Sequence, residues 1–440
     1  MSQPAPIRAR DRDAILQSLR AGVVPRTGLQ HIQVGRVDEV KALLQDLDRV
    51  ADGGSGFRFV IGEYGSGKTF FLYLIRAIAL EKKLVTAHVD LNPDRRLYGT
   101  GGQARSMYTE LTRTLSTRAK PDGGALPSVV ERFITSAVDE ARARGLKPDA
   151  VIRERLASLS EMTGGYDFAE VVAAWWKGHE TGNDALQSSA VRWLRGEFTT
   201  KTDARAAVGV RTIVDDDQVY DQLKLLARFV RLAGYAGLLL CLDELVNLYK
   251  LANTKARNTN YEQILRILND SLQGSSVGLG ILLGGTPEFL LDPRKGLYSY
   301  PALQSRLAEN TFASGSLVDL SGPVLRLANL SAEDLFILLG KLRHVQAGGD
   351  SSKYLVPDEG LTAFMTHCSK RVGDAYFRTP RNTITAFVNL LAILEQNPQA
   401  SWQEMLGATE VPGDENPDLT PVATSEGDGD GDDELASFKL

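Results

Sequence analysis

The strongest constraint in this 440-residue sequence is a segment at residues 62–69 that matches the pattern G-x-x-x-x-G-K-[ST]. A short apolar run at 57–61 precedes the segment and is typical of a buried strand. The stretch that follows, 70–79, has helical length and contains neither glycine nor proline. A strand, a glycine-rich loop and a helix in this order form the local structure in which such a loop binds phosphate. The sequence therefore predicts an α/β domain that binds a nucleotide.

Each fixed position of this loop has a physical reason. Glycines let the backbone curl until several N–H groups point inward, and the following helix adds the positive end of its dipole. Lys68 would reach the β- and γ-phosphates, and the Thr69 hydroxyl would hold Mg²⁺. The alternative is a glycine-rich turn without a ligand. We expect ATP and Mg²⁺ as cofactors, bound through Gly62, Glu63, Tyr64, Gly65, Ser66, Gly67, Lys68, Thr69 and Phe70.

Composition excludes few other classes of protein. The chain is 43% apolar and 24% charged, as in an ordinary globular protein with room for two or three domains. No stretch of 18 residues is without charge and residues 1–8 have no apolar leader core, so we expect no membrane span and no signal peptide. Two cysteines without metal spacing, Cys241 and Cys368, fit a cytoplasmic location.

The formal net charge of −5 is concentrated at the C-terminus. Residues 411–440 contain nine carboxylates and one lysine, a local charge of −8 that leaves about +3 on the rest of the chain. That remainder neither requires nor excludes a nucleic-acid surface. Because proline, glycine and acidic residues dominate this end without periodicity, residues 401–440 are predicted to form an acidic disordered tail.

Apolar runs at 57–61, 84–91, 238–242 and 277–283 are typical of strands, and helical patterns separate them. This alternation predicts a parallel sheet with helices on both faces. We expect an N-terminal helical extension at 1–30, a core at 31–325 and a helical domain at 326–400. The core would include a helical insertion at about 97–210.

An acidic pair, Asp243 and Glu244, ends the strand at 238–242. An aspartate at the carboxyl end of a strand beside the phosphate loop can hold Mg²⁺ together with Thr69. The adjacent glutamate is placed to orient and polarise the water that attacks the γ-phosphate. Many strands end in acidic residues, so this interpretation depends on the phosphate loop.

Further candidates follow the later elements. Thr286 comes after the strand at 277–283 and could lie between the acidic pair and the γ-phosphate, although a β-turn on Gly-Gly-Thr-Pro would explain it equally. Arg306 and Arg381 could neutralise phosphate charge, and an arginine in such a role can come from a neighbouring subunit. Arg378 is the second choice for the role of Arg381. A surface arginine without function is the alternative in each case.

The order of these elements resembles the AAA+ branch of P-loop ATPases, in the style of origin-initiator and loader proteins. The turn that contains Gly35 and Arg36 is similar to the box that contacts the adenine side of the nucleotide in that group. The resemblance implies that 62–69 is Walker A and 238–244 is Walker B. It also implies sensor 1 at Thr286, the arginine finger near Arg306, and sensor 2 at Arg381 on a helix of the lid domain.

More narrowly, residues 60–72, 240–245, 284–289 and 378–381 look like the ATP-binding proteins of BREX-type phage-defence systems, the BrxD-like group. The resemblance covers about residues 8–400. It implies an Mg²⁺-dependent ATPase switch in bacterial anti-phage defence, acting on a DNA-associated protein such as a helicase. Direct DNA contact and a homo-oligomer are compatible with it. A nucleotide-gated scaffold with little turnover and a P-loop kinase remain the alternatives.

Two features depart from the AAA+ pattern. The interval between Walker A and Walker B is wide because of the stretch at 97–210, and the sequence shows no winged-helix domain after the lid. Binding of duplex DNA by such a domain is therefore not expected.

Overall fold

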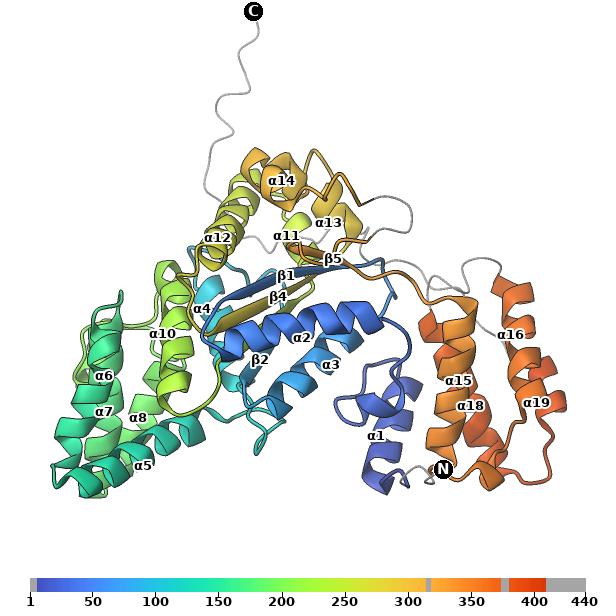
Figure 1. Cartoon of the computed structure of the whole chain (residues 1–440), viewed down its shortest axis with the longest axis horizontal. Coiled ribbons are helices and arrows are strands. Elements are labelled where there is room, and N and C mark those ends of the chain that lie inside the picture. The colour runs from blue at the N-terminus through green and yellow to red at the C-terminus, as the bar shows by residue number, and fades with distance from the viewer. Residues whose placement is uncertain (1–5, 314–317, 373–379, 409–440) are drawn as a thin grey trace, which may run out of the picture.

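The computed structural model describes residues 6–313, 318–372 and 380–408. Within these residues the core is a five-stranded, all-parallel sheet with the order β2-β3-β4-β1-β5 (Figure 1). The strands are β1 Gly56–Ile61, β2 Val85–Asp90, β3 Leu238–Asp243, β4 Leu279–Gly285 and β5 Val324–Arg326. The predicted α/β class and parallel sheet are confirmed. The sequence pattern does not predict β5, which has only three residues.

Both faces of the sheet are covered, so its strands are continuous apolar runs. On one face, α2 (Val37–Ala51) and α3 (Lys68–Glu81) bury Leu47 and Phe71 against strand residues such as Val60. On the opposite face, Phe59 belongs to a larger apolar cluster whose helices include α4 (Gln103–Arg113), α10 (Val219–Leu232) and α12 (Thr254–Leu272). Neighbouring residues of β1 therefore anchor two different helical layers.

The segment between α4 and α10 forms a helical bundle at one end of the molecule, shown in green in Figure 1. Successive helices of this bundle pack on one another: α5 Leu126–Arg144, α6 Pro148–Ser160, α7 Gly165–Thr181, α8 Asp184–Leu194 and α9 Lys201–Val208. The helix α4 instead packs on β2, so the bundle proper begins after it.

The C-terminal helices, which we call the lid after the helical domain predicted at 326–400, lie at the opposite end and have their own apolar cluster. The helices of the lid are α15 Ala332–Gln346, α16 Asp358–Val372, α18 Pro380–Gln396 and α19 Trp402–Ala408. The α15 helix begins with a capping box between Ser331 and Asp334, which satisfies backbone N–H groups at its first turn.

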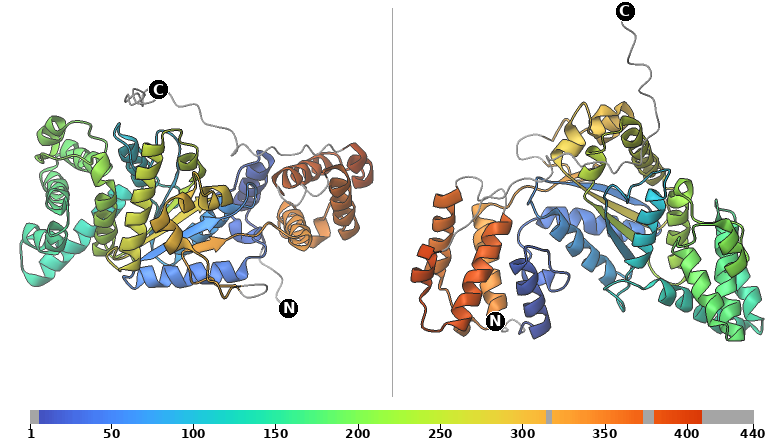
Figure 2. Two further views of the ribbon diagram at one scale, coloured as in Figure 1. Left: turned by 90° about the horizontal axis from the view of Figure 1, so that it is seen from above. Right: turned by 180° about the vertical axis from the view of Figure 1, so that it is seen from behind.

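The N-terminal helix α1 (Ala9–Arg20) packs against α15 and α18, between the lid and the core (Figure 2). Ile15 is completely buried in the lid cluster, and Ile32 joins the same cluster. Arg12 Nε also donates a 2.8 Å hydrogen bond to the carbonyl of Gln346 at the end of α15. The helix is therefore a structural part of the lid, although nearly the whole core separates the two in sequence.

Short helices complete the described part of the chain: α11 Val246–Tyr249, α13 Pro287–Leu291, α14 Pro301–Leu307, and the 3₁₀ turns Leu29–His31, Asp216–Gln218, Leu297–Ser299 and Ser351–Lys353. Among the described helices, none combines the length and the apolar character needed to cross a bilayer.

Because the strands run parallel, the segments after β1, β3 and β4 meet at one edge of the sheet.

Candidate functional site

The phosphate loop connects β1 directly to α3, as the sequence predicts. Gly65 and Gly67 have φ values of +77° and +81°, where a side chain would strain the backbone. Lys68 Nζ donates hydrogen bonds to the carbonyls of Gly62 and Glu63, each 2.9 Å long. The loop is thus curled around an ammonium group at the N-terminus of a 14-residue helix. Such an arrangement binds anions.

A tightly held carboxylate lies beside this loop. Thr69 Oγ1 donates a 2.6 Å hydrogen bond to Asp243 Oδ2, and Asp243 Oδ1 accepts one of 2.9 Å from the backbone N–H of Glu244. Asp243 is only 2% exposed. A Cβ atom at Gly284 would lie 2.2 Å from Asp243 Oδ1, so glycine is required on the neighbouring strand. The hydroxyl and carboxylate oxygens are the kind of ligands that Mg²⁺ prefers.

The second acidic residue has a different environment. Glu244 is exposed and lines the cavity described below. Its φ is 60°, in the left-handed region that a residue with a Cβ occupies at a cost of about 1–3 kcal/mol. Among the described residues, Arg36 and Lys83 also have positive φ without being glycine, and Arg36 lines the same cavity. Strain of this kind clusters at functional positions.

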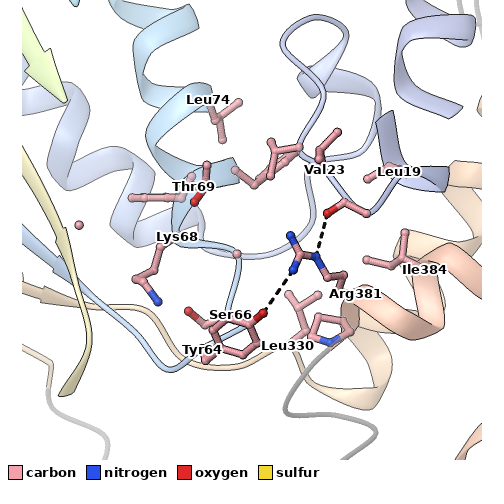
Figure 3. Close-up of a pocket in the computed structure, with 18 of the residues that line it drawn as sticks. Leu19, Val23, Tyr64, Ser66, Lys68, Thr69, Leu74, Leu330, Arg381 and Ile384 are labelled. Atoms are coloured by element: carbon pink, nitrogen blue, oxygen red, sulfur yellow. Dashed lines mark hydrogen bonds between the residues drawn. The ribbon is translucent and has the colours of Figure 1, made fainter. Parts of the chain in front are cut away.

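A cavity of about 250 Å³ opens between the phosphate loop, the N-terminal segment and the lid (Figure 3). Its polar end contains Lys68, Thr69 and Glu244. Its other walls are mainly apolar and come from residues that the sequence analysis does not single out: Leu19, Val23, Val24, Pro25, Ile32, Leu74, Leu330, Leu338 and Ile384. The one available signal is the apolar run at 23–25, which directly follows a charged helix. A ligand with one anionic and one apolar end fits this cavity.

Arg36 connects the turn at 34–36 to the phosphate loop. Its Nη2 donates hydrogen bonds to the carbonyl of Ser66 and, at 3.3 Å, to that of Ala328. Burial lowers the pKa of the Arg36 guanidinium, and the carboxylates of Glu39 and Asp334 oppose that shift. Gly35 does not line the cavity; with φ at +65° it forms the turn that places Arg36.

Arg381, on α18, lines the wall of the cavity that the lid forms (Figure 3). Its Nε donates a 2.8 Å hydrogen bond to the carbonyl of Gly22, and its Nη1 donates one of 3.3 Å to the Tyr64 hydroxyl. The second choice for this role, Arg378, lies outside the described residues.

Thr286 caps a short helix and also lines the cavity. Its hydroxyl accepts a 3.4 Å hydrogen bond from the N–H of Phe289 and so caps α13, while the residue is 3% exposed and lines the cavity. Arg306 lies elsewhere, on α14, where it donates hydrogen bonds of 2.8 Å to Asn269 Oδ1 and to the carbonyl of Ala302.

The structure brings most of the predicted site residues together. The cavity is lined by Arg36, Tyr64, Gly65, Ser66, Gly67, Lys68, Thr69, Phe70, Glu244, Thr286 and Arg381. Asp243 lies behind Thr69, Gly62 packs under Ser66, and Glu63 accepts a 2.9 Å hydrogen bond from Asn329 Nδ2. Gly35, Gly62, Glu63, Asp243 and Arg306 are not part of the lining. No group of three or more histidine, cysteine or acidic residues suited to a metal ion occurs in the described ranges.

Comparison with known proteins adds an independent finding. Residues 7–410 match the model of one protein family, described as BREX system ATP-binding protein BrxC/D. A search of curated proteins finds no match to the chain.

Proposed function

Because the chain belongs to the family of BREX system ATP-binding proteins BrxC/D, we propose that it is an Mg²⁺-dependent ATPase that acts as a molecular switch. The observation that carries the proposal is the 2.6 Å hydrogen bond between Thr69 Oγ1 and Asp243 Oδ2 at the start of α3. These two oxygens lie beside the phosphate loop, and Glu244 follows Asp243 directly. A binding loop, metal ligands and a candidate for activating water are therefore contiguous.

Lys68 would exchange the carbonyls of Gly62 and Glu63 for the β- and γ-phosphate oxygens of ATP. The loop amides and the helix dipole would bind the remaining phosphate charge. Thr69 and Asp243 would hold Mg²⁺, which neutralises charge on the phosphates when it is bound. The apolar end of the cavity suits the base.

Glu244 would orient and polarise the water that attacks the γ-phosphate. Thr286 would contact the γ-phosphate from the end of β4, and Arg381 would approach it from the lid. Arg306 lies away from the cavity of its own chain, so it would act in the site of a neighbouring subunit. Lys68, Glu244, Thr286 and Arg306 are then the residues of the hydrolytic reaction.

The switch would act on a protein partner that is associated with DNA, such as a helicase-like component of the defence system. Two facts support this proposal: the lid and α1 both contribute walls to the cavity, and the family is described as the ATP-binding protein of a BREX system. Nucleotide exchange would change the walls, and through them the surface offered to the partner.

The first test is phosphate release from ATP with Mg²⁺ and without any acceptor. We expect turnover that EDTA abolishes. Glu244→Gln should still bind ATP but hydrolyse it at least about a hundredfold more slowly, because it cannot accept a proton from water. Glu262→Gln, an exposed residue of α12, is the matched control and should hydrolyse ATP like the wild type.

The other outcomes separate the alternatives. Wild-type turnover in Glu244→Gln would reject the role of Glu244. Phosphate transfer only to an added acceptor would favour a kinase, since Glu244 would then activate a substrate hydroxyl. Tight ATP retention without turnover, even with DNA added, would favour a nucleotide-gated scaffold. Mass measurement in ADP and in a non-hydrolysable ATP analogue would reveal whether a homo-oligomer forms.

A further inference from the structure

Two side chains of the phosphate loop contact the lid. Glu63 and Tyr64 occupy positions that the loop pattern leaves open, because the amide cradle requires only the glycines, Lys68 and Thr69. Glu63 Oε2 accepts a 2.9 Å hydrogen bond from Asn329 Nδ2, in the connection between β5 and α15. The Tyr64 hydroxyl accepts a 3.3 Å hydrogen bond from Arg381 Nη1, at the start of α18. Two consecutive residues of the loop thus contact the connection that leads into the lid and the lid helix α18.

Arg381 joins Tyr64 to a third part of the chain. The same guanidinium donates its Nε hydrogen to the carbonyl of Gly22, directly after the α1 region, at 2.8 Å. Figure 3 shows Arg381 between Tyr64 and the N-terminal segment. Since α1 packs on α18, one side chain links the phosphate loop, the lid helix and the N-terminal helix.

The carbonyl between Glu63 and Tyr64 accepts two hydrogen bonds, one of 2.9 Å from Lys68 Nζ and one of 3.1 Å from the N–H of Ser66. When Lys68 turns to a phosphate group, that carbonyl loses the bond from Lys68 and keeps the one from Ser66, so the peptide unit is held by one hydrogen bond instead of two. Rotation would move both side chains that contact the lid. The loop therefore has a direct mechanical route from phosphate occupancy to Arg381.

We propose that Tyr64 is a positioning residue, which holds the Arg381 guanidinium and thereby couples the phosphate loop to the lid and α1. The contact between Glu63 and Asn329 supports the same coupling at the lid connection. The inference rests on the proposed function, because coupling matters only if the loop binds the phosphates of a nucleotide.

A double-mutant cycle with Tyr64→Phe and Arg381→Ala tests the proposal in the full chain. Tyr64→Phe should lower kcat by about three- to tenfold, the effect of one hydrogen bond, while KM changes less than about twofold. The same substitution should have a clearly smaller effect in the Arg381→Ala background, because the hydrogen bond between the two side chains is already absent there. Tyr166→Phe, at a 65% exposed tyrosine of α7, is the matched control.

A second readout reports the lid directly. Gln45→Cys on α2 and Asn389→Cys on α18 would place probes on exposed positions of the core and the lid. The native Cys241 and Cys368 are buried, and burial raises the pKa of both thiols to about 12, so they should not be labelled. The probe distance should change between ADP and a non-hydrolysable ATP analogue. Tyr64→Phe should reduce that change, and again clearly less when Arg381 is absent.

The outcomes separate this inference from the function on which it rests. Equal losses from Tyr64→Phe with and without Arg381, or no loss at all, would overturn the positioning role and leave the ATPase intact. A wild-type chain that binds no fluorescent ATP analogue would overturn both. If the wild type binds nucleotide without turnover, the cycle on probe distance decides the matter.

Discussion

The two ends of the cavity are built by different means. The polar end, which we call the phosphate end, comes from three short segments that follow β1, β3 and β4. Its contacts are polar and are nearly fully specified by local motifs. The apolar end, which we call the base end, is formed by aliphatic side chains from the N-terminal segment, the connection after β5 and the lid helices. The N-terminal segment and α18 lie more than 350 residues apart in the chain, as Gly22 and Arg381 illustrate.

We infer from this difference that the polar end serves the reaction and the apolar end serves the conformational response. A polar cradle loses its function when one atom is misplaced, so it is placed on strand ends within the packed core. An apolar wall tolerates exchange of one aliphatic side chain for another, and so it can be supplied by a body that moves. The phosphate end should therefore determine whether ATP binds and reacts, and the base end should determine what the molecule does in response.

The largest expected effect concerns the phosphate end. Lys68→Ala should weaken the binding of both ATP and inorganic tripolyphosphate by about a hundredfold or more, because two charge-assisted hydrogen bonds are lost. Calorimetric titration in the presence of Mg²⁺ would measure both affinities. Lys41→Ala, an exposed lysine of α2, is the control. If the variant bound ATP within threefold of the wild-type affinity, the base end alone would provide the binding free energy, which is the opposite of what we expect.

An intermediate effect is expected at the base end. Val23→Asn should weaken ATP binding by about tenfold, since an uncharged polar amide replaces an apolar contact with the base. The affinity for tripolyphosphate, which has no base, should stay unchanged. The two ligands compared on one variant therefore report the two ends separately.

Val23 is 52% exposed, so its replacement should not unfold the chain. Leu146→Asn provides a matched control, because this leucine is 44% exposed and lies in the distant helical bundle. If Val23→Asn weakened tripolyphosphate binding as much as ATP binding, the two ends would not be separable.

The smallest expected effect is on stability. Glu244 has a left-handed backbone, so Glu244→Gly should be more stable than Glu244→Ala by about 1 kcal/mol in thermal unfolding. At Glu262, inside α12, the order should invert, because glycine costs about 1 kcal/mol relative to alanine in a helix. The same order at both sites would indicate that Glu244 stores no strain.

The sequence predicts the phosphate end well because its determinants are local. A strand, a glycine loop and a helix are contiguous, and Asp243 follows a strand whose apolar run is unmistakable. Parallel strand ends then bring Thr69 and Asp243 together, which requires no knowledge of distant packing.

The base end could not be predicted in this way. Leu19 and Val23 carry no motif, and their partners in α18 follow more than 350 residues later. The role of α1 as a helix of the lid depends on the burial of Ile15 among lid side chains, a tertiary fact that periodicity does not encode. The strand β5 is too short to leave a pattern, and yet it leads directly into the lid.

The packing of α1 on the lid has a geometric consequence. The lid body is attached to the core at two points in the chain, through residues 21–36 and through residues 327–331. Two chain connections restrict the relative orientation of two bodies more than one connection does. We therefore expect the lid to move less freely than a domain on a single connection, and a proteolytic cut within 21–28 to increase that freedom.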